Sequence, residues 1–378
     1  MSLGFLVRER RIIVCVGSGG VGKTTTAAAF ALAGARAGRR TLVMTIDPAR
    51  RLANSLGLER LDHNEQRVPD DKIAPPGSEK VAGSLHAMML DQKRAFDEIA
   101  DHYLQGDAAR ARVRENRIYQ QISSTLTGSH EYAAMAKLWA VSEEGRYDLI
   151  VLDTPPTQNA LDFLDAPEKL VGAVDSPALQ WFAKLYFNHS LKVIGMGGAF
   201  VIKRLARFVG SRFLEDVGQF VGENGAMLDG FRERAHAVQA LLRRSDVAFV
   251  LVCSPEPLSV DEALYFHQRL GDQHMPLGGF VVNRVHPQGP AAASREALIE
   301  ALTERPELRG FAPDDTVQVA ADLDRTYRDF QALAEIDARE IARLATATHG
   351  APHVKVPLFD RDIYDVEGLT LINQFLVS

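Results

Sequence analysis

The residues best suited to chemistry form a glycine-rich stretch near the N-terminus, at residues 17–25. The stretch fits the pattern G-x-x-x-x-G-K-[ST], which is typical of a loop that binds phosphate groups. Glycines are needed there because a side chain would hold the backbone N–H groups away from the phosphate oxygens. In such a loop Lys23 reaches the β- and γ-phosphates, and the hydroxyl of Thr24 is a ligand of Mg²⁺. The residues expected to bind the nucleotide are Gly19, Gly20, Val21, Gly22, Lys23, Thr24 and Thr25.

The segments on either side of this loop support that prediction. Residues 12–16 are a short apolar run rich in β-branched side chains, which is typical of a buried strand. Residues 25–33 are rich in alanine and predict a helix, with Gly38 near its end. A loop between a strand and a helix places a phosphate at the helix N-terminus, so a chance glycine-rich turn explains the stretch less well.

Two carboxylates follow predicted strands and complete a candidate site. A strand over residues 41–46 ends at Asp47, and a later apolar run ends in Asp153. Ligands of open parallel sheets bind at the carboxyl ends of the strands. Asp47 is therefore expected near the γ-phosphate, where it orients an attacking water or holds the water shell of the metal; the alternative is a helix cap before residues 49–53. Asp153 fits a Walker B carboxylate, which holds Mg²⁺ across from Thr24.

The rest of the chain alternates strand and helix signals. This predicts an α/β fold, a doubly wound and mostly parallel sheet in a single P-loop domain over residues 1–378. Residues 62–83 are polar with several prolines, which predicts a surface loop. Further strands are expected at residues 84–90, 247–252, 279–283 and 353–357, and further helices at 259–270, 322–344 and 369–376.

An inserted helical subdomain is expected over approximately residues 92–145 and 165–244. Its second part is rich in large apolar side chains, among them Phe200, Phe208, Phe213 and Phe220. One interpretation is a surface for a membrane-protein client, a lipid or a partner helix. The other is a subdomain that buries these side chains against itself or against a second subunit.

Composition excludes several classes of protein. The chain has 378 residues, 46% of them hydrophobic, and a net charge of −6, which argues against an overall basic nucleic-acid binder. Cys15 and Cys253 lie in apolar runs and are expected to be buried thiols. No C-x-x-C pair is present, so no zinc site of the usual spacing is expected. We find no signal peptide and no apolar run of the roughly 20 residues that a membrane span needs, which predicts a cytoplasmic protein.

Taken together, these motifs resemble those of the arsenical-pump and guided-entry ATPases, the ArsA/Get family of P-loop proteins. The phosphate loop is similar to the family's G-K-G-G-V-G-K-T-[TS]; Asp47 opens a segment similar to its D-P-A, and Asp153 a segment similar to its D-T-A-P-T. Residues 85–91 resemble its L-x-A-M-x-x-D, and residues 252–259 its V-x-x-P-E-x-L-S. The pattern is nearer to bacterial ArsA-like anion-transporting ATPases, which have D-P-A-[KR]-R-L-A and D-T-P-P-T.

The resemblance implies an ATPase that works as a homodimer, or as a heterodimer with a paralogue, with the nucleotide at the subunit interface. It implies that Asp47 orients the attacking water and that clients bind the helical subdomain. It also implies adenine contacts from Asn283, Pro357 and Leu358. This chain departs from the family at Ser18, which replaces an intersubunit lysine, and it lacks the cysteines that zinc or arsenite binding needs there.

The main hypothesis is an Mg²⁺-dependent ATPase that converts ATP and water to ADP and phosphate, and thereby switches a dimer that gates a helical client-binding surface. Lys23 and Asp47 are its expected catalytic residues, and Thr24 and Asp153 its expected metal ligands. One alternative, suggested by Ser18, is a nucleotide-bound regulatory or structural subunit with little turnover. Another is a positioning ATPase of the ParA/MinD type, which shares the loop but usually brings a basic or amphipathic tail.

Overall fold

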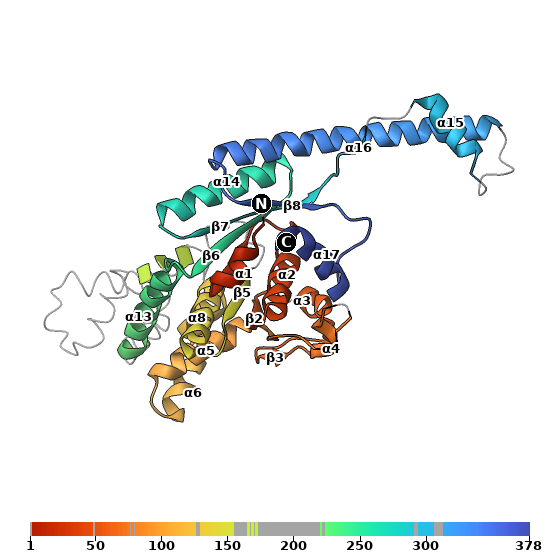
Figure 1. Cartoon of the computed structure of the whole chain (residues 1–378). Helices are drawn as coiled ribbons and strands as arrows, with labels where there is room; N and C mark the ends of the chain where they lie inside the picture. Colours follow the sequence, from red (N-terminus) through yellow and green to blue (C-terminus); the bar gives the residue numbers. More distant parts are fainter. Residues whose placement is uncertain are drawn as a thin grey trace, which may run out of the picture.

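A mostly parallel sheet forms the centre of the fold (Figure 1). The computed structural model describes residues 2–47, 50–75, 77–78, 80–125, 129–154, 165–166, 168–169, 171–172, 220, 224–290, 294–305 and 313–378. The strands are β1 (Ile12–Val16), β2 (Arg40–Thr45), β3 (Gln66–Arg67), β4 (Ser84–Met89), β5 (Leu149–Asp153), β6 (Val247–Cys253), β7 (Leu277–Val285) and β8 (His353–Pro357).

Thirteen helices are described in the same residues. They are α1 (Gly4–Glu9), α2 (Lys23–Arg36), α3 (Arg51–Ser55), α4 (Asp70–Ile73), α5 (Gln92–Tyr103), α6 (Asp107–Glu115), α7 (Arg117–Thr125), α8 (Ser129–Glu144), α13 (Gly225–Leu242), α14 (Pro257–Asp272), α15 (Arg295–Thr303), α16 (Pro313–Ala347) and α17 (Val366–Leu376).

The order of the strands brings the carboxyl ends of β2, β5 and β1, which are far apart in the sequence, close together in the sheet. The order is β3-β4-β2-β5-β1-β6-β7-β8, and neighbouring strands are parallel except for the pair of β3 and β4. Thr45 on β2 is in register with Asp153 on β5, and Asp153 is in register with Cys15 on β1. The loop that follows β1 therefore lies beside the ends of β5 and β2. The predicted doubly wound α/β fold is confirmed.

Helices cover both faces of the sheet, and each face has its own core. Helices α1, α2, α3, α4 and α17 pack on one face, while α5, α7, α8, α13, α14 and the C-terminal part of α16 pack on the other. Along β2, Leu42 and Met44 belong to one core and Val43 to the other. Because both faces are covered, the strands are continuous apolar runs instead of alternating ones.

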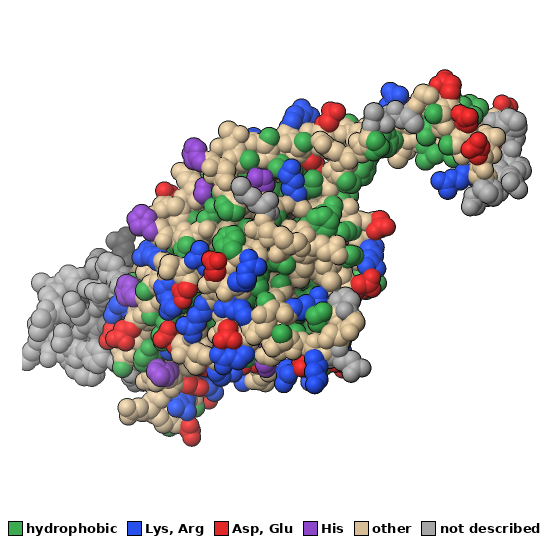
Figure 2. Space-filling view, in the orientation of Figure 1, with side chains coloured by type: hydrophobic (Ala, Val, Ile, Leu, Met, Phe, Trp, Pro, Cys, Tyr) green, Lys and Arg blue, Asp and Glu red, His purple; other side chains and the backbone are tan. Residues whose placement is uncertain are grey.

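Helices α15 and α16 form an arm that projects from the sheet (Figure 1). Helix α16 has 35 residues; Ile341 and Leu344 near its C-terminal end are buried, while Val317, Leu323 and Leu333 are exposed. Figure 2 shows hydrophobic side chains along this arm, with acidic ones near its tip. The described part of the chain leaves this apolar stripe uncovered.

Several short elements differ from the expectations. The segment expected as a surface loop, residues 62–83, contains β3 and α4, and α1 precedes the first predicted strand. Helix α16 starts at Pro313 instead of residue 322, and α15 was not expected. Elements of two to six residues, such as α1, α4 and β3, are too short to show a hydrophobic period, which explains why the sequence did not reveal them.

The helical part of the chain is described only in pieces. The described residues between 92 and 145 contain α5, α6, α7 and α8, in agreement with the helical pattern, and α13 comes from the second predicted segment. Phe200, Phe208 and Phe213 lie outside the described residues. Phe220 is 2% exposed, and its ring centroid lies 6.4 Å from that of Tyr119, so this phenylalanine is part of the core. Among the helices that the structure describes, none combines the length and apolarity needed to cross a bilayer.

Candidate active site

The glycine-rich loop connects β1 to α2, as the sequence predicted. Its last glycine, Gly22, is the N-cap of α2 and has a φ of +98°. That left-handed conformation favours glycine, and a Cβ there would overlap the side-chain amide of Asn283. Helix α2 begins at Lys23, so the N–H groups of its first turn, which have no partner within a helix, lie at the end of the loop. Loop and helix N-terminus together form a site suited to phosphate.

Lys23 lies across the loop that precedes it. It is 6% exposed, and its Nζ donates a hydrogen bond of 2.7 Å to the backbone carbonyl of Ser18. Burial lowers the pKa of Lys23, while the carboxylates of Asp153 and Asp47 act in the opposite direction. The ammonium is therefore held between the loop and the two acidic residues, where it can exchange a carbonyl partner for a phosphate oxygen.

Asp153 ends β5 in the deepest part of the site. Its carboxyl group is fully buried, and burial raises its pKa to about 6 against opposing contributions from Thr45, Thr24 and Lys23. The Thr45 hydroxyl donates a 2.8 Å hydrogen bond to Oδ2, and the nearby Thr24 side chain also lowers the pKa of this carboxyl group. The other oxygen, Oδ1, has no hydrogen-bond partner among the described residues. The predicted proximity of Thr24 and Asp153 is thus present in the structure.

Asp47 follows β2, one strand further along the sheet. Its backbone N–H donates a hydrogen bond of 3.2 Å to the Thr45 hydroxyl. Helix α3 begins at Arg51 with Arg50 as its N-cap, so the alternative of Asp47 as the cap of that helix is wrong. Asp47 acts electrostatically on both Lys23 and Asp153, which places the three charged groups in one site.

The residues expected to contact adenine lie on the other side of the loop. Asn283 on β7 donates a hydrogen bond of 2.8 Å from Nδ2 to the carbonyl of Val21. Pro357 ends β8, and the N–H of Leu358 donates to the carbonyl of Val285 at 2.9 Å. The structure brings Asn283 to the loop and places the other two residues at the end of the neighbouring strand, while their contacts with adenine stay a prediction.

A cavity of about 260 Å³ opens between the loop and the segment that joins β6 to α14. The Ser18 hydroxyl lies 3.5 Å from that of Ser259, and the Ser259 oxygen accepts a 3.0 Å hydrogen bond from the N–H of Ser254. Arg284 also lines this cavity and has a φ of +62°, a conformation that is uncommon for a residue with a side chain. Ser18, which occupies the position of the family's lysine, therefore lines this cavity.

The two thiols lie on opposite faces of the sheet. Cys15 belongs to the core around α2, and Cys253 to the core around α14. Burial raises the pKa of Cys253 to about 12 and raises that of Cys15 as well. Two protonated thiols separated by the sheet are poor ligands for a metal or metalloid, because the thiolate is the form that binds.

The site contains a glycine-rich loop between a central strand and its helix, a buried lysine, and a carboxylate at the end of the adjacent strand. This combination defines a P-loop nucleotide hydrolase. The chain matches the family described as anion-transporting ATPase over residues 10–299, and it belongs to that family. It is accordingly an ATPase, and the resemblance read from its motifs is confirmed.

Its relatives carry names of the same kind. The chain is 27% identical over 271 residues to "ATPase ASNA1 homolog 1" of Paramecium tetraurelia, covering 71% of this chain and 73% of the relative. It is 26% identical over 282 residues to "ATPase get3" of Botryotinia fuckeliana, covering 74% and 73%. With "Putative arsenical pump-driving ATPase" of Halobacterium salinarum it shares 34% identity over 176 residues, 46% of this chain and 26% of that protein.

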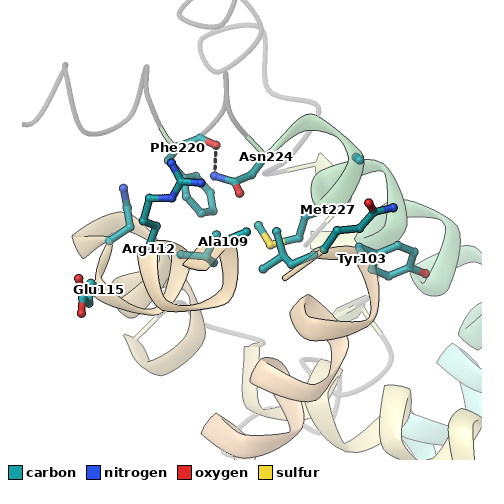
Figure 3. Close-up of a pocket in the computed structure, with 12 residues that line it drawn as sticks. Tyr103, Ala109, Arg112, Glu115, Phe220, Asn224 and Met227 are labelled. Carbon is teal, nitrogen blue, oxygen red and sulfur yellow. Dashed lines mark hydrogen bonds between the residues drawn. The ribbon is translucent and has the colours of Figure 1, made fainter. Parts of the chain in front are cut away.

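A larger cavity lies away from the loop, between α5, α6 and α13 (Figure 3). Its volume is about 520 Å³, and its walls combine apolar and polar side chains. Tyr103, Val113, Phe220 and Met227 supply apolar surface, and Arg112 supplies a positive charge. Figure 3 shows Arg112 and Phe220 among the residues that line this cavity, and the Phe220 carbonyl accepts a 2.9 Å hydrogen bond from the Asn224 side chain.

One residue of the site carried no sequence signal. Thr45 is buried and contacts both acidic segments. A threonine inside an apolar run is common in strands, so the sequence pattern indicated a strand residue and no role in the site. Its contact with Asp153 depends on the register between β2 and β5, which are far apart in the sequence.

Proposed function

We propose that this ATPase uses Mg²⁺ and ATP to switch between two states of a dimer, and that the switch controls a client surface on its helical part. The observation that carries the catalytic part of this proposal is the meeting of Lys23, Asp47 and Asp153 at the N-terminus of α2. Lys23 is the first residue of α2, Asp153 ends β5 and Asp47 follows β2, and the electrostatic effects of these three groups on one another support the proposal.

The residues present fit a hard divalent cation. Mg²⁺ prefers oxygen ligands, and the site offers the Asp153 carboxylate and the Thr24 hydroxyl. The buried Oδ1 of Asp153, which has no partner in the described part of the chain, supports a role in holding the metal or its water. A bound Mg²⁺ would neutralise charge on the β- and γ-phosphates. We assign Thr24 and Asp153 to hold it.

Phosphate binding and the orientation of the attacking water are assigned to side chains and backbone N–H groups of the protein itself. The N–H groups of residues 19–25 face the phosphates, and Lys23 exchanges its bond to the Ser18 carbonyl for one to a phosphate oxygen. Asp47, at the end of the strand beyond Asp153, orients the attacking water. The buried position of Lys23 and Asp153 strengthens these electrostatic contacts, because little water competes for them.

The proposals of a dimer and a client depend on family likeness and on one partly apolar cavity. Relatives named ASNA1 homolog 1 and get3 align with 71% and 74% of this chain, and the resemblance implies a homodimer or a heterodimer with a paralogue. The cavity beside Phe220 offers space for an apolar side chain of a client, next to the cationic Arg112. A membrane protein or a lipid is the class of client that such a surface favours.

The test of the catalytic roles compares matched carboxylates at two adjacent strand ends. Asp47→Asn should lower the turnover number by roughly 10²-fold or more while ATP still binds, since the loop is intact. Asp91→Asn is the control: Asp91 caps α5 by accepting a 2.9 Å hydrogen bond from the Arg94 N–H, and asparagine caps helices equally well. Turnover that survives Asp47→Asn, or that falls equally in Asp91→Asn, would contradict the assigned role.

A further inference from the structure

A single buried hydroxyl joins the two acidic segments of the site. The Thr45 Oγ1 donates to Oδ2 of Asp153 at 2.8 Å and accepts from the backbone N–H of Asp47 at 3.2 Å. Thr45 is 1% exposed, so water does not compete for either bond. One hydroxyl has one proton to donate, and the structure directs it to the carboxylate while a lone pair takes the amide.

This arrangement holds one carboxylate oxygen of Asp153 and the backbone amide of Asp47. With Oδ2 held by Thr45, the other oxygen of the Asp153 carboxylate is buried and has no partner within the described residues. The bond from the Asp47 N–H turns the backbone directly after β2, in the manner of a threonine turn. Partners that hydrogen-bond to a metal-binding carboxylate orient it and tune its affinity.

We propose that Thr45 is a positioning residue that couples the metal-binding carboxylate of Asp153 to the backbone of the water-orienting Asp47. This inference rests on the proposed function, and it adds a residue that no motif of the chain indicates. A shift of the Asp153 carboxylate toward a bound cation is transmitted to Asp47 through the shared hydroxyl. Conversely, movement of the segment after Asp47 acts on the carboxylate.

The experiment compares three variants of β2. Thr45→Val keeps the shape of the side chain and removes the hydroxyl, whereas Thr45→Ser keeps the hydroxyl. Thr41→Val is the matched control, because Thr41 is also fully buried on β2 and its hydroxyl donates only to the carbonyl of Arg39, away from the site. Two quantities are measured: hydrogen exchange of the Asp47 amide in nucleotide-free protein, and the Mg²⁺ concentration that gives half-maximal ATP turnover.

We expect Thr45→Val to raise the half-saturating Mg²⁺ concentration by about 10-fold to 100-fold, the range found when a partner of a metal ligand is removed. The Asp47 amide should exchange faster by about tenfold, since its acceptor is gone. Thr45→Ser should restore both quantities, and Thr41→Val should leave both unchanged. ATP binding in the presence of a chelator should be the same in all variants.

The coupling is refuted if Thr45→Val leaves Asp47 exchange and the Mg²⁺ dependence as in the wild type, or if Thr41→Val changes them equally. A loss of thermal stability in Thr45→Val without a change in Mg²⁺ dependence would show a merely structural threonine and also overturn it. Failure of the proposed function looks different: the wild type itself would hydrolyse no ATP or show no Mg²⁺ dependence. The exchange measurement on nucleotide-free protein still decides whether Thr45 holds the Asp47 amide in that case.

Discussion

Replacing Asp153 by asparagine should stabilise the nucleotide-free protein at neutral pH while abolishing its ATPase activity. Asp153 is fully buried, and burial is the largest cause of the rise of its pKa to about 6. Hydrogen bonds from Thr45 and Thr24 and the charge of Lys23 reduce the rise without cancelling it. At neutral pH the folded chain therefore holds an ionised carboxylate in a place that favours the neutral form.

The size of the effect follows from the difference between the folded and unfolded pKa values. A rise from the model-compound value of 3.8 to about 6 corresponds to about 3 kcal/mol of unfolding free energy. Because the pKa of Asp153 is higher in the folded state than in the unfolded state, protonation of Asp153 stabilises the fold, and this stabilisation is fully present below the unfolded pKa. It is lost as the pH rises through the folded pKa. Asparagine does not titrate, so the advantage of Asp153→Asn should develop between about pH 4 and pH 6.

The assay is urea unfolding of wild type and Asp153→Asn, with a chelator and without nucleotide, across that pH range. Asp148→Asn, at the other end of β5, is the control with the opposite sign. The hydrogen bond from Arg40 lowers the pKa of Asp148 to about 2, so its stabilisation is lost only as the pH falls from about 4 toward 2, below the range in which Asp153 titrates. Asp148 is 39% exposed, and solvent screening limits that loss to roughly 1 kcal/mol or less.

The reasoning would be refuted by an Asp153→Asn variant that is less stable than the wild type at neutral pH. A difference that does not change with pH would refute it too, because the cause would then be packing and not charge. Loss of ATP turnover together with a gain in stability is the expected combination, since a residue that serves a ligand often costs stability in the free protein.

Three further substitutions test the loop. Gly22→Ala should cost about 1–3 kcal/mol of unfolding free energy in urea titrations and abolish ATP binding, because φ is +98° and a Cβ overlaps the Asn283 amide. Asn283→Ala should weaken ATP binding by about fivefold in a fluorescent-nucleotide titration, since it removes a hydrogen bond to Val21 worth about 1 kcal/mol. In the double variant with Gly22→Ala, the shorter side chain at position 283 should relieve the overlap with the new Cβ. Losses of stability that simply add in the double variant would contradict this contact. Ser18→Lys should raise the steady-state turnover number by about tenfold if a missing cation limits the reaction, whereas the uncharged Ser18→Met should not.

The sequence predicted the parts of the site that follow from local patterns. Lys23 has a fixed spacing from the glycines, and Asp47 and Asp153 each end an apolar run, so their positions at strand ends followed from the fold class. Thr45 was not predicted, because its role depends on the register of two strands that are about a hundred residues apart. The same limit applies to the bond between Asn283 and Val21, which joins the last part of the sheet to the loop.

The burial of Asp153 also bears on how binding at this site can drive a change elsewhere. A charged carboxylate that is short of partners raises the free energy of the nucleotide-free fold, and a cation at Oδ1 would remove that penalty. Cation binding would thus stabilise the Asp153 carboxylate at the end of β5, where Thr45 connects this carboxylate to the backbone of Asp47. Asp47 precedes the segment that leads into α3, so under the proposed function a change in the Asp153 carboxylate would be transmitted to that segment. A ligand shifts a two-state equilibrium only through interactions that differ between the states, and under the proposed function this hydrogen-bonded pair of strand ends is where we expect such a difference.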